Sequence, residues 1–117
     1  MEQKHILTED ELAEIVIDLG AARKGLINES WLGMFGGWVK WLLKGMFGGQ
    51  MNQLAGRVKG SRSEIESFAK ALAKEKDYMS LVSRYGLNDA RTYKSKFKLQ
   101  QASREFERST GIKWPFK

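Results

Sequence analysis

The side chains best suited to chemistry in this chain are cations that gather in its second half. Residues 57–117 hold fifteen of the twenty lysines and arginines and carry a net charge of +8, whereas residues 1–56 carry −2. Such a basic surface is typical of proteins that contact phosphates. The same cations also fit a solvated face or an acidic protein partner. The candidate nucleic-acid contacts are Arg84, Arg91, Lys94, Lys98, Arg104 and Arg108.

No arrangement of residues predicts catalysis. The one histidine, His5, lies near the N-terminus, so a histidine-based nucleophilic triad is not expected. The acidic pairs stand two residues apart on expected helices and therefore face different sides; they are Glu64/Glu66, Glu75/Asp77 and Glu105/Glu107. There is no P-loop and no cysteine. We expect a non-enzymatic protein with no cofactor and no metal.

A second candidate contact region is rich in glycine and tryptophan. Residues 31–49 read WLGMFGGWVKWLLKGMFGG, in which the word GMFGG occurs twice. Each glycine costs a helix about 1 kcal/mol relative to alanine, so this density needs a reason. At helical spacing a stripe of glycine and lysine lies opposite a wide apolar face. The candidate contacts of this face with a partner or a membrane are Trp31, Phe35, Trp38, Trp41, Leu42 and Met46.

The glycine stripe and the two lysines limit what can cover this apolar face. Gly33/Gly37 and Gly45/Gly49 are GxxxG pairs, which allow two helices to approach closely. Lys40 and Lys44 argue against a membrane span, because a central lysine costs about 2.5–3.5 kcal/mol on insertion. Shallow insertion at a bilayer interface remains possible in physical terms. The favoured interpretation is a core helix or a protein interface.

The expected elements are helices. In the first half we expect a helix over about 9–24 after a capping box at Thr8–Glu11, with Leu12, Ile15, Val16 and Leu19 inward. A second helix, capped by Asn28 or Ser30, passes through the glycine-tryptophan segment. Residues 50–59 are expected to continue as helix.

The second half predicts a helical hairpin. Ser63 and Glu66 form a capping box for a helix over about 64–85, and Gly86 is expected to end it in an αL turn with Leu87 packed back. Asn88-Asp89 caps a helix over about 90–109, and Trp114 and Phe116 of the tail are expected to dock. The expected inward positions of the hairpin include Ile65, Phe68, Leu72, Met79, Val82, Tyr93, Phe97, Ala102 and Phe106.

These elements predict an all-α fold, a small bundle of four to five helices with a Gly/Trp-rich apolar helix and a basic C-terminal helical hairpin. No strand pattern is recognised. Residues 1–60 and 61–117 are expected to form one compact domain or two subdomains. The first fourteen residues are acidic and lack an apolar run, so a signal peptide is not expected.

The C-terminal run YGLNDARTYKSKFKLQQASREFERSTGIKWPFK resembles the small helical accessory proteins of tailed bacteriophages. The triplet Ile27-Asn28-Glu29 is similar to sites cut by prohead proteases, as are Leu7-Thr8-Glu9 and Leu12-Ala13-Glu14. The resemblance implies a prohead-core or internal virion protein that is packed near DNA and cleaved near Glu29. It would act in the cytoplasm or within a virion or prohead.

The sequence hypothesis is therefore a virion-associated or scaffold protein. Its apolar helix would assemble with a protein partner or another copy, and its basic hairpin would meet nucleic acid or an acidic surface. Two alternatives remain: a membrane-active protein that inserts residues 31–49 at a bilayer interface, and a small phage inhibitor that binds an acidic host protein.

Overall fold

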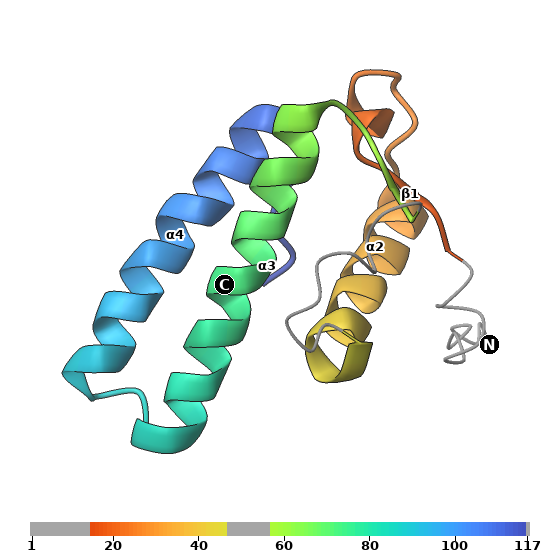
Figure 1. Ribbon diagram of the computed structural model, residues 1–117. Helices are drawn as coiled ribbons and strands as arrows, with labels where there is room; N and C mark the ends of the chain where they lie inside the picture. The colour runs from red at the N-terminus through yellow and green to blue at the C-terminus, as the bar shows by residue number, and fades with distance from the viewer. Residues whose placement is uncertain (1–14, 47–56, 117) are drawn as a thin grey trace.

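The computed structural model describes residues 15–46 and 57–116 (Figure 1). Their elements run β1 (Ile17–Asp18), the 3₁₀ turn η1 (Leu19–Ala22), α2 (Glu29–Trp41), the π turn η2 (Leu42–Met46), β2 (Val58–Lys59), α3 (Arg62–Tyr85) and α4 (Ala90–Thr110). The mostly helical character expected from the sequence is confirmed. The described residues nevertheless form three α-helices and a two-stranded sheet, and not a clear bundle of four or five helices.

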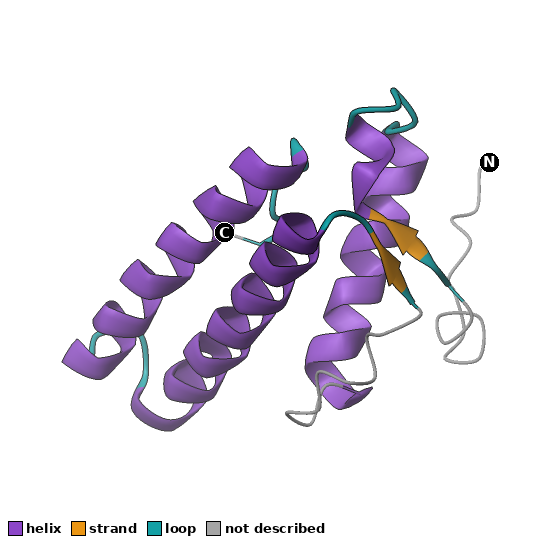
Figure 2. Cartoon of the chain, turned by 45° about the horizontal axis from the view of Figure 1, so that its top comes forward, coloured by secondary structure: helices purple, strands orange, loops and turns teal. Residues whose placement is uncertain are grey.

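The expected first helix is wrong over the residues that the structure describes. Ile17 and Asp18 form strand β1, which pairs in parallel with β2 in the register Ile17 to Val58 and Asp18 to Lys59 (Figure 2). Ile17 is fully buried and Val16 is half exposed, the reverse of the helical assignment. The run Ile15-Val16-Ile17 consists of β-branched residues, whose restricted χ1 angles favour a strand. Residues 9–14 and the Thr8–Glu11 capping box lie outside the described residues.

Strand β2 is a second departure from the expected helices. Val58 and Lys59 were expected to end a helical stretch over 50–59, but they pair with β1. Gly60 then turns the chain into α3. A Cβ at Gly60 would lie 2.9 Å from Glu64 Oε1 and 3.1 Å from Leu19 Cβ, so a side chain does not fit at this junction. Residues 50–56 lie outside the described residues.

Helix α2 runs through the glycine-tryptophan segment and packs into the core. Asn28 caps it by accepting a 2.9 Å hydrogen bond from the Trp31 backbone N–H, as expected. Phe35 and Trp38 are 1% and 0% exposed, and their rings lie 5.9 Å from Phe68 of α3. One hydrophobic core therefore spans both halves of the sequence.

This burial corrects the expected contact face of the glycine-tryptophan segment. Phe35, Trp38 and Leu42 are buried, so in this fold they cover the hairpin of the same chain and present no face to a partner or a bilayer. Trp31 and Trp41 are half-buried and pack against the same core. The side chain of Met46 lies outside the described residues. No helix in the described parts of the chain is both long enough and apolar enough to cross a bilayer.

The GxxxG pair on α2 makes no close approach in this fold. A Cβ built on Gly33 or on Gly37 would meet no other atom within 4 Å. The expectation of close helix packing at this pair is therefore not met among the described residues, because α2 turns Phe35 and Trp38 to the core and leaves Gly33 and Gly37 exposed. Gly49 of the second pair lies outside the described residues.

Helix α3 begins two residues earlier than expected, because Ser61 and Glu64 form its capping box and not Ser63 and Glu66. Ser61 Oγ accepts from the Glu64 backbone N–H at 3.2 Å, and Glu64 Oε1 accepts from the Ser61 N–H at 2.7 Å. The pattern Ser-x-x-Glu occurs twice in residues 61–66, so local sequence allows either box. In the box that forms, Glu64 is buried and its carboxylate also lies 2.7 Å from the guanidinium of Arg23, which follows η1.

Helix α4 runs back along α3 and ends at Gly111, which takes the αL conformation with φ of 75°. The tail then crosses the hairpin and docks as expected. Trp114 is buried, with its ring 5.2 Å from that of Phe106, and its indole N–H donates to Glu75 Oε1 at 2.9 Å. Phe116 packs edge-on against Trp114.

Candidate nucleic-acid interface

The α3–α4 hairpin extends beyond the core that α2 and the tail build at its open end. The last buried residue of α3 is Glu75, although the helix continues to Tyr85. We call residues 76–98, at the closed end of the hairpin, the hairpin tip (Figure 1). Five of the eight exposed large apolar side chains in the described residues lie on it: Met79, Tyr85, Leu87, Tyr93 and Phe97. Such a concentration is typical of interaction surfaces.

At the tip, α4 exposes side chains that the sequence predicts to face inward. Tyr93 and Phe97, expected to face inward, are 59% and 60% exposed. Thr92 and Ser95 are buried in their place, and the Thr92 hydroxyl donates to the Gly86 carbonyl at 2.8 Å. A satisfied hydroxyl inside and two aromatic rings outside reverse the ordinary pattern of a helix. This reversal is expected at sites where function competes with local stability.

The loop at the tip also differs from the expected Schellman motif. Gly86 has a positive φ of 81°, but its ψ of 172° is extended and not αL. The loop therefore does not form a Schellman motif, and Leu87 is 62% exposed instead of packed. Met79, expected inward on α3, is exposed as well. The apolar surface of the tip thus comes from both helices and from the loop between them.

The six candidate phosphate contacts are all exposed on the hairpin, but they differ in their surroundings. Arg91 is held by Asp89, whose carboxylate accepts from Arg91 Nε at 2.9 Å and from Nη2 at 3.0 Å. The guanidinium also lies 3.4 Å from the centre of the Tyr85 ring. The hydrogen bonds from Arg91 lower the pKa of Asp89 to about 2, so the pair stays charged at neutral pH. Arg91 therefore has part of its charge compensated.

Lys94 and Lys98 lie one helical turn apart on α4, both exposed. The stretch from Ala90 to Arg104 holds five lysines and arginines and no acidic residue. Helix α3, by contrast, mixes five cations with four acids. The uncompensated positive charge of the hairpin is therefore concentrated on α4, on both sides of the exposed Tyr93 and Phe97.

Arg104 and Arg108 belong to the open end of the hairpin and not to its tip. From Arg91 to Arg108 the helix rises about 25 Å, at 1.5 Å per residue. Glu105 lies between Arg104 and Arg108 in the sequence and forms a 3.3 Å ion pair with Lys70 of α3. Arg84 stands in the last turn of α3, near the loop. The structure thus brings Arg84, Arg91, Lys94 and Lys98 to one end and leaves Arg104 and Arg108 at the other.

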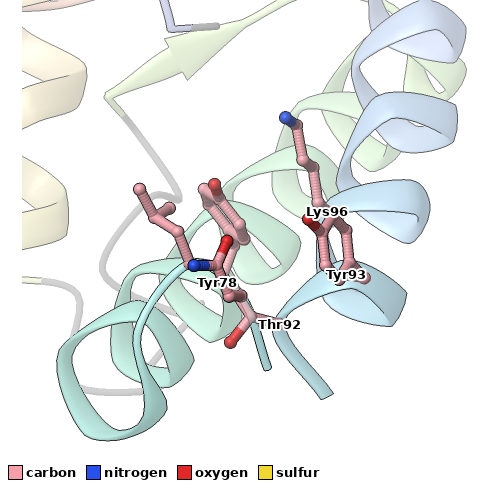
Figure 3. A pocket seen from close by; sticks show the side chains of 6 residues that line it. Tyr78, Thr92, Tyr93 and Lys96 are labelled. Carbon is pink, nitrogen blue, oxygen red and sulfur yellow. The ribbon is translucent and has the colours of Figure 1, made fainter. Parts of the chain in front are cut away.

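A groove along the hairpin adds residues that the sequence analysis did not select. It consists of two adjoining hollows of about 140 and 340 Å³ that share Tyr78 of α3 and Lys96 of α4. The smaller hollow reaches the loop at Leu87, and the larger one reaches Trp114 and Phe116 of the tail. Figure 3 shows Tyr78 on one side of the smaller opening and Tyr93 and Lys96 on the other. We call these two hollows the hairpin groove.

The sequence contains only a partial signal for this groove. Tyr93 and Lys96 stand three residues apart, which places them on neighbouring positions of one helix side. Tyr78 and Trp114 reach the same groove through the antiparallel pairing of α3 with α4 and the return of the tail. That pairing is a tertiary fact, so no local spacing predicts it.

Glu75 sets the position of the tail beside the groove. Its burial raises the pKa of its carboxyl, and the hydrogen bond from the Trp114 indole opposes that rise. The Trp114 backbone N–H donates in addition to Glu107 Oε2 at 3.0 Å. Two carboxylates, one from each helix, thus hold Trp114 between them.

Comparisons of the chain with protein-family models, with curated proteins and with solved structures gave no match.

Proposed function

We propose that this protein is a non-enzymatic nucleic-acid-binding module that contacts phosphates with the outer side of α4. The observation that carries the proposal is the run from Ala90 to Arg104, where five exposed cations and no acid flank two exposed aromatic rings. Cations supply affinity for any phosphate backbone, and aromatic rings among them are typical of surfaces that meet bases.

The arrangement favours non-specific binding. Lysines on one exposed helix side neutralise phosphates as point charges and read no base edges. From Arg91 to Arg104 these cations extend over about 20 Å of helix axis, long enough to follow several phosphates of a backbone. Of the two surfaces in the sequence hypothesis, the hairpin is the exposed one, since the apolar side of α2 is buried. This supports the hairpin as the contact surface.

The resemblance of residues 85–117 to phage accessory proteins supports a virion or prohead as the setting. In that setting we propose that the hairpin packs against DNA. An inhibitor that binds an acidic host protein is the competing proposal for the same cations, and the salt dependence and ligand choice described below distinguish the two.

The test is fluorescence anisotropy of a labelled DNA with the full chain, over a series of salt concentrations. We expect log affinity to fall linearly with log salt. The double variant Lys94→Gln/Lys98→Gln should weaken binding equally for unrelated sequences and should reduce the magnitude of the salt slope by about 2.

The matched control is Lys40→Gln/Lys44→Gln, which removes the same charge from exposed positions of α2 and η2. This control should change the salt slope little. Equal effects of the two double variants would mean that only net charge matters. Absence of binding, or an affinity that does not respond to salt, would contradict the proposal.

A further inference from the structure

The hairpin groove has walls that suit flat rings. Tyr78, Tyr93, Trp114 and Phe116 line it from α3, α4 and the tail. Tyr93 is 59% exposed, and the rings of Trp114 and Phe116 lie edge to face with centres 6.3 Å apart. Of these side chains Trp114 is held in place by its hydrogen bond to Glu75, so its position is set before any ligand arrives.

One cation stands among these rings. Lys96 lines both hollows of the groove and is exposed. Lys94 and Lys98 stand two residues before and after it in the sequence, so they face another side of α4 and add positive charge there. An aromatic groove with a lysine inside it, on a helix that carries further lysines, matches a ligand that alternates flat apolar rings with negative charges. Unpaired nucleotides have this chemistry, because each base has an open π-face and each linkage carries a phosphate.

A duplex does not offer the same fit. In a double helix the bases are stacked on one another, so their faces are not available to protein rings, and only phosphates and base edges reach the surface. The outer side of α4 can contact the phosphates of either form of nucleic acid, whereas the groove can contact only unpaired bases that are not stacked on their neighbours.

We propose that the hairpin groove binds unpaired bases, so that the protein prefers single-stranded over double-stranded nucleic acid. This inference rests on the proposed function and adds the class of ligand. Tyr93 and Tyr78 stack on bases in the smaller hollow, and Trp114 and Phe116 line the larger one. Lys96 contacts a phosphate between the two hollows.

The test compares a labelled single strand with the duplex of the same sequence, each bound by the full chain at one salt concentration. We expect tighter binding to the single strand. Tyr93→Ala should lower the single-strand affinity about tenfold, because one base loses its stacking partner, and should leave duplex affinity nearly unchanged.

The chain offers a matched control at Phe97. Phe97 lies one helical turn from Tyr93 and is 60% exposed, but it does not line the groove. Phe97→Ala should keep the preference for the single strand. Lys96→Gln and Lys94→Gln form a second pair: both should weaken binding, but only Lys96→Gln should reduce the ratio of single-strand to duplex affinity. Circular dichroism of each variant checks that it is folded.

The outcomes separate the two proposals. Equal affinity for single strand and duplex, or equal loss of preference in Tyr93→Ala and Phe97→Ala, overturns the groove inference and leaves the phosphate-binding function standing. Binding of neither form overturns the proposed function itself. Tight binding of polyglutamate with no preference for the oligonucleotide assigns the groove to an acidic protein partner and overturns both.

Discussion

Helices α2 and α4 both carry large aromatic residues one turn apart, but they place them in opposite environments. Phe35 and Trp38 of α2 are buried against Phe68, whereas Tyr93 and Phe97 of α4 are more than half exposed. The difference arises from what lies across from each helix. Helix α2 faces the open end of the hairpin, where Phe68, Phe106 and Trp114 form the core. At the tip, α4 faces α3 through small polar residues, Thr92 and Ser95.

The comparison shows that hydrophobic content does not identify a contact surface in this chain. The segment with the highest density of tryptophan and glycine covers the protein's own core. The segment that reads as an ordinary amphipathic helix leaves its rings exposed, with lysines on both sides. The exposed rings are the ones to which a function can be assigned, since buried rings are accounted for by packing.

The largest expected effect is the loss of stability when one ring is removed from each helix. We expect Trp38→Ala to lower the free energy of unfolding by about 3–5 kcal/mol, because it leaves a cavity beside Phe68. Phe97→Ala should change it by less than about 0.5 kcal/mol, since its ring is exposed. Urea denaturation of both variants measures the two values.

A second variant at the same position sharpens the result. The Trp38 indole N–H is buried and finds no acceptor among the described residues. Trp38→Phe should therefore cost much less than Trp38→Ala, since it keeps most of the ring and removes an unsatisfied donor. A large loss in Phe97→Ala, comparable with that of Trp38→Ala, would show that the tip is packed and not exposed.

An intermediate effect is expected where the tail joins the two regions. Trp114→Phe removes the N–H that donates to the buried Glu75, so we expect the free energy of unfolding to fall by about 1–3 kcal/mol.

Glu75→Gln keeps an oxygen acceptor for Trp114 and removes a buried charge, so it should raise the melting temperature at neutral pH.

The Glu75 variant also has a defined pH dependence. Burial raises the pKa of Glu75 in the folded state above 4.5, so its contribution to stability is fully present below that value and is lost as pH rises through the folded-state pKa. The advantage of Glu75→Gln should therefore be present at neutral pH and should vanish in acid. Melting temperatures measured across this range check it, and a constant difference at every pH would contradict the assignment.

The smallest expected effect concerns the outer side of α2. Gly33→Ala and Gly37→Ala should each stabilise the protein by about 0.5–1 kcal/mol, because alanine favours a helix and the added methyl groups meet no atom within 4 Å. Thermal melts measure the gain. Light scattering adds a second readout, since loss of self-association in these variants would show that the glycines serve a second helix outside this chain.

Local signals predicted much of the hairpin. Asp89 caps α4, and α3 and α4 begin and end within two residues of their expected bounds. Outside the hairpin, Asn28 caps α2 as expected. Trp114 docks as its aromatic character indicated. These features depend on a few neighbouring residues, whose hydrogen bonds and backbone preferences are the same in any fold.

The candidate site could be predicted only in part. The basic stretch with Lys94 and Lys98 was found from charge alone, but the inward set for α4 was wrong at Tyr93 and Phe97. The apolar residues of α4 fit more than one helical stripe, and only the position of α3 decides which stripe is buried. Tyr78 and Lys96 were missed because they meet across the hairpin.

By itself, the sequence determined the helical hairpin, the N-terminal cap of α4, the positive charge of the hairpin and the docking of its tail. The tertiary structure alone decided that Ile17 pairs with Val58, that the glycine-tryptophan helix covers the core, and that Tyr93 faces out. The physical reason is range. Capping, turn and charge signals act between neighbours in the chain, whereas burial depends on which distant surface arrives to exclude water from a side chain.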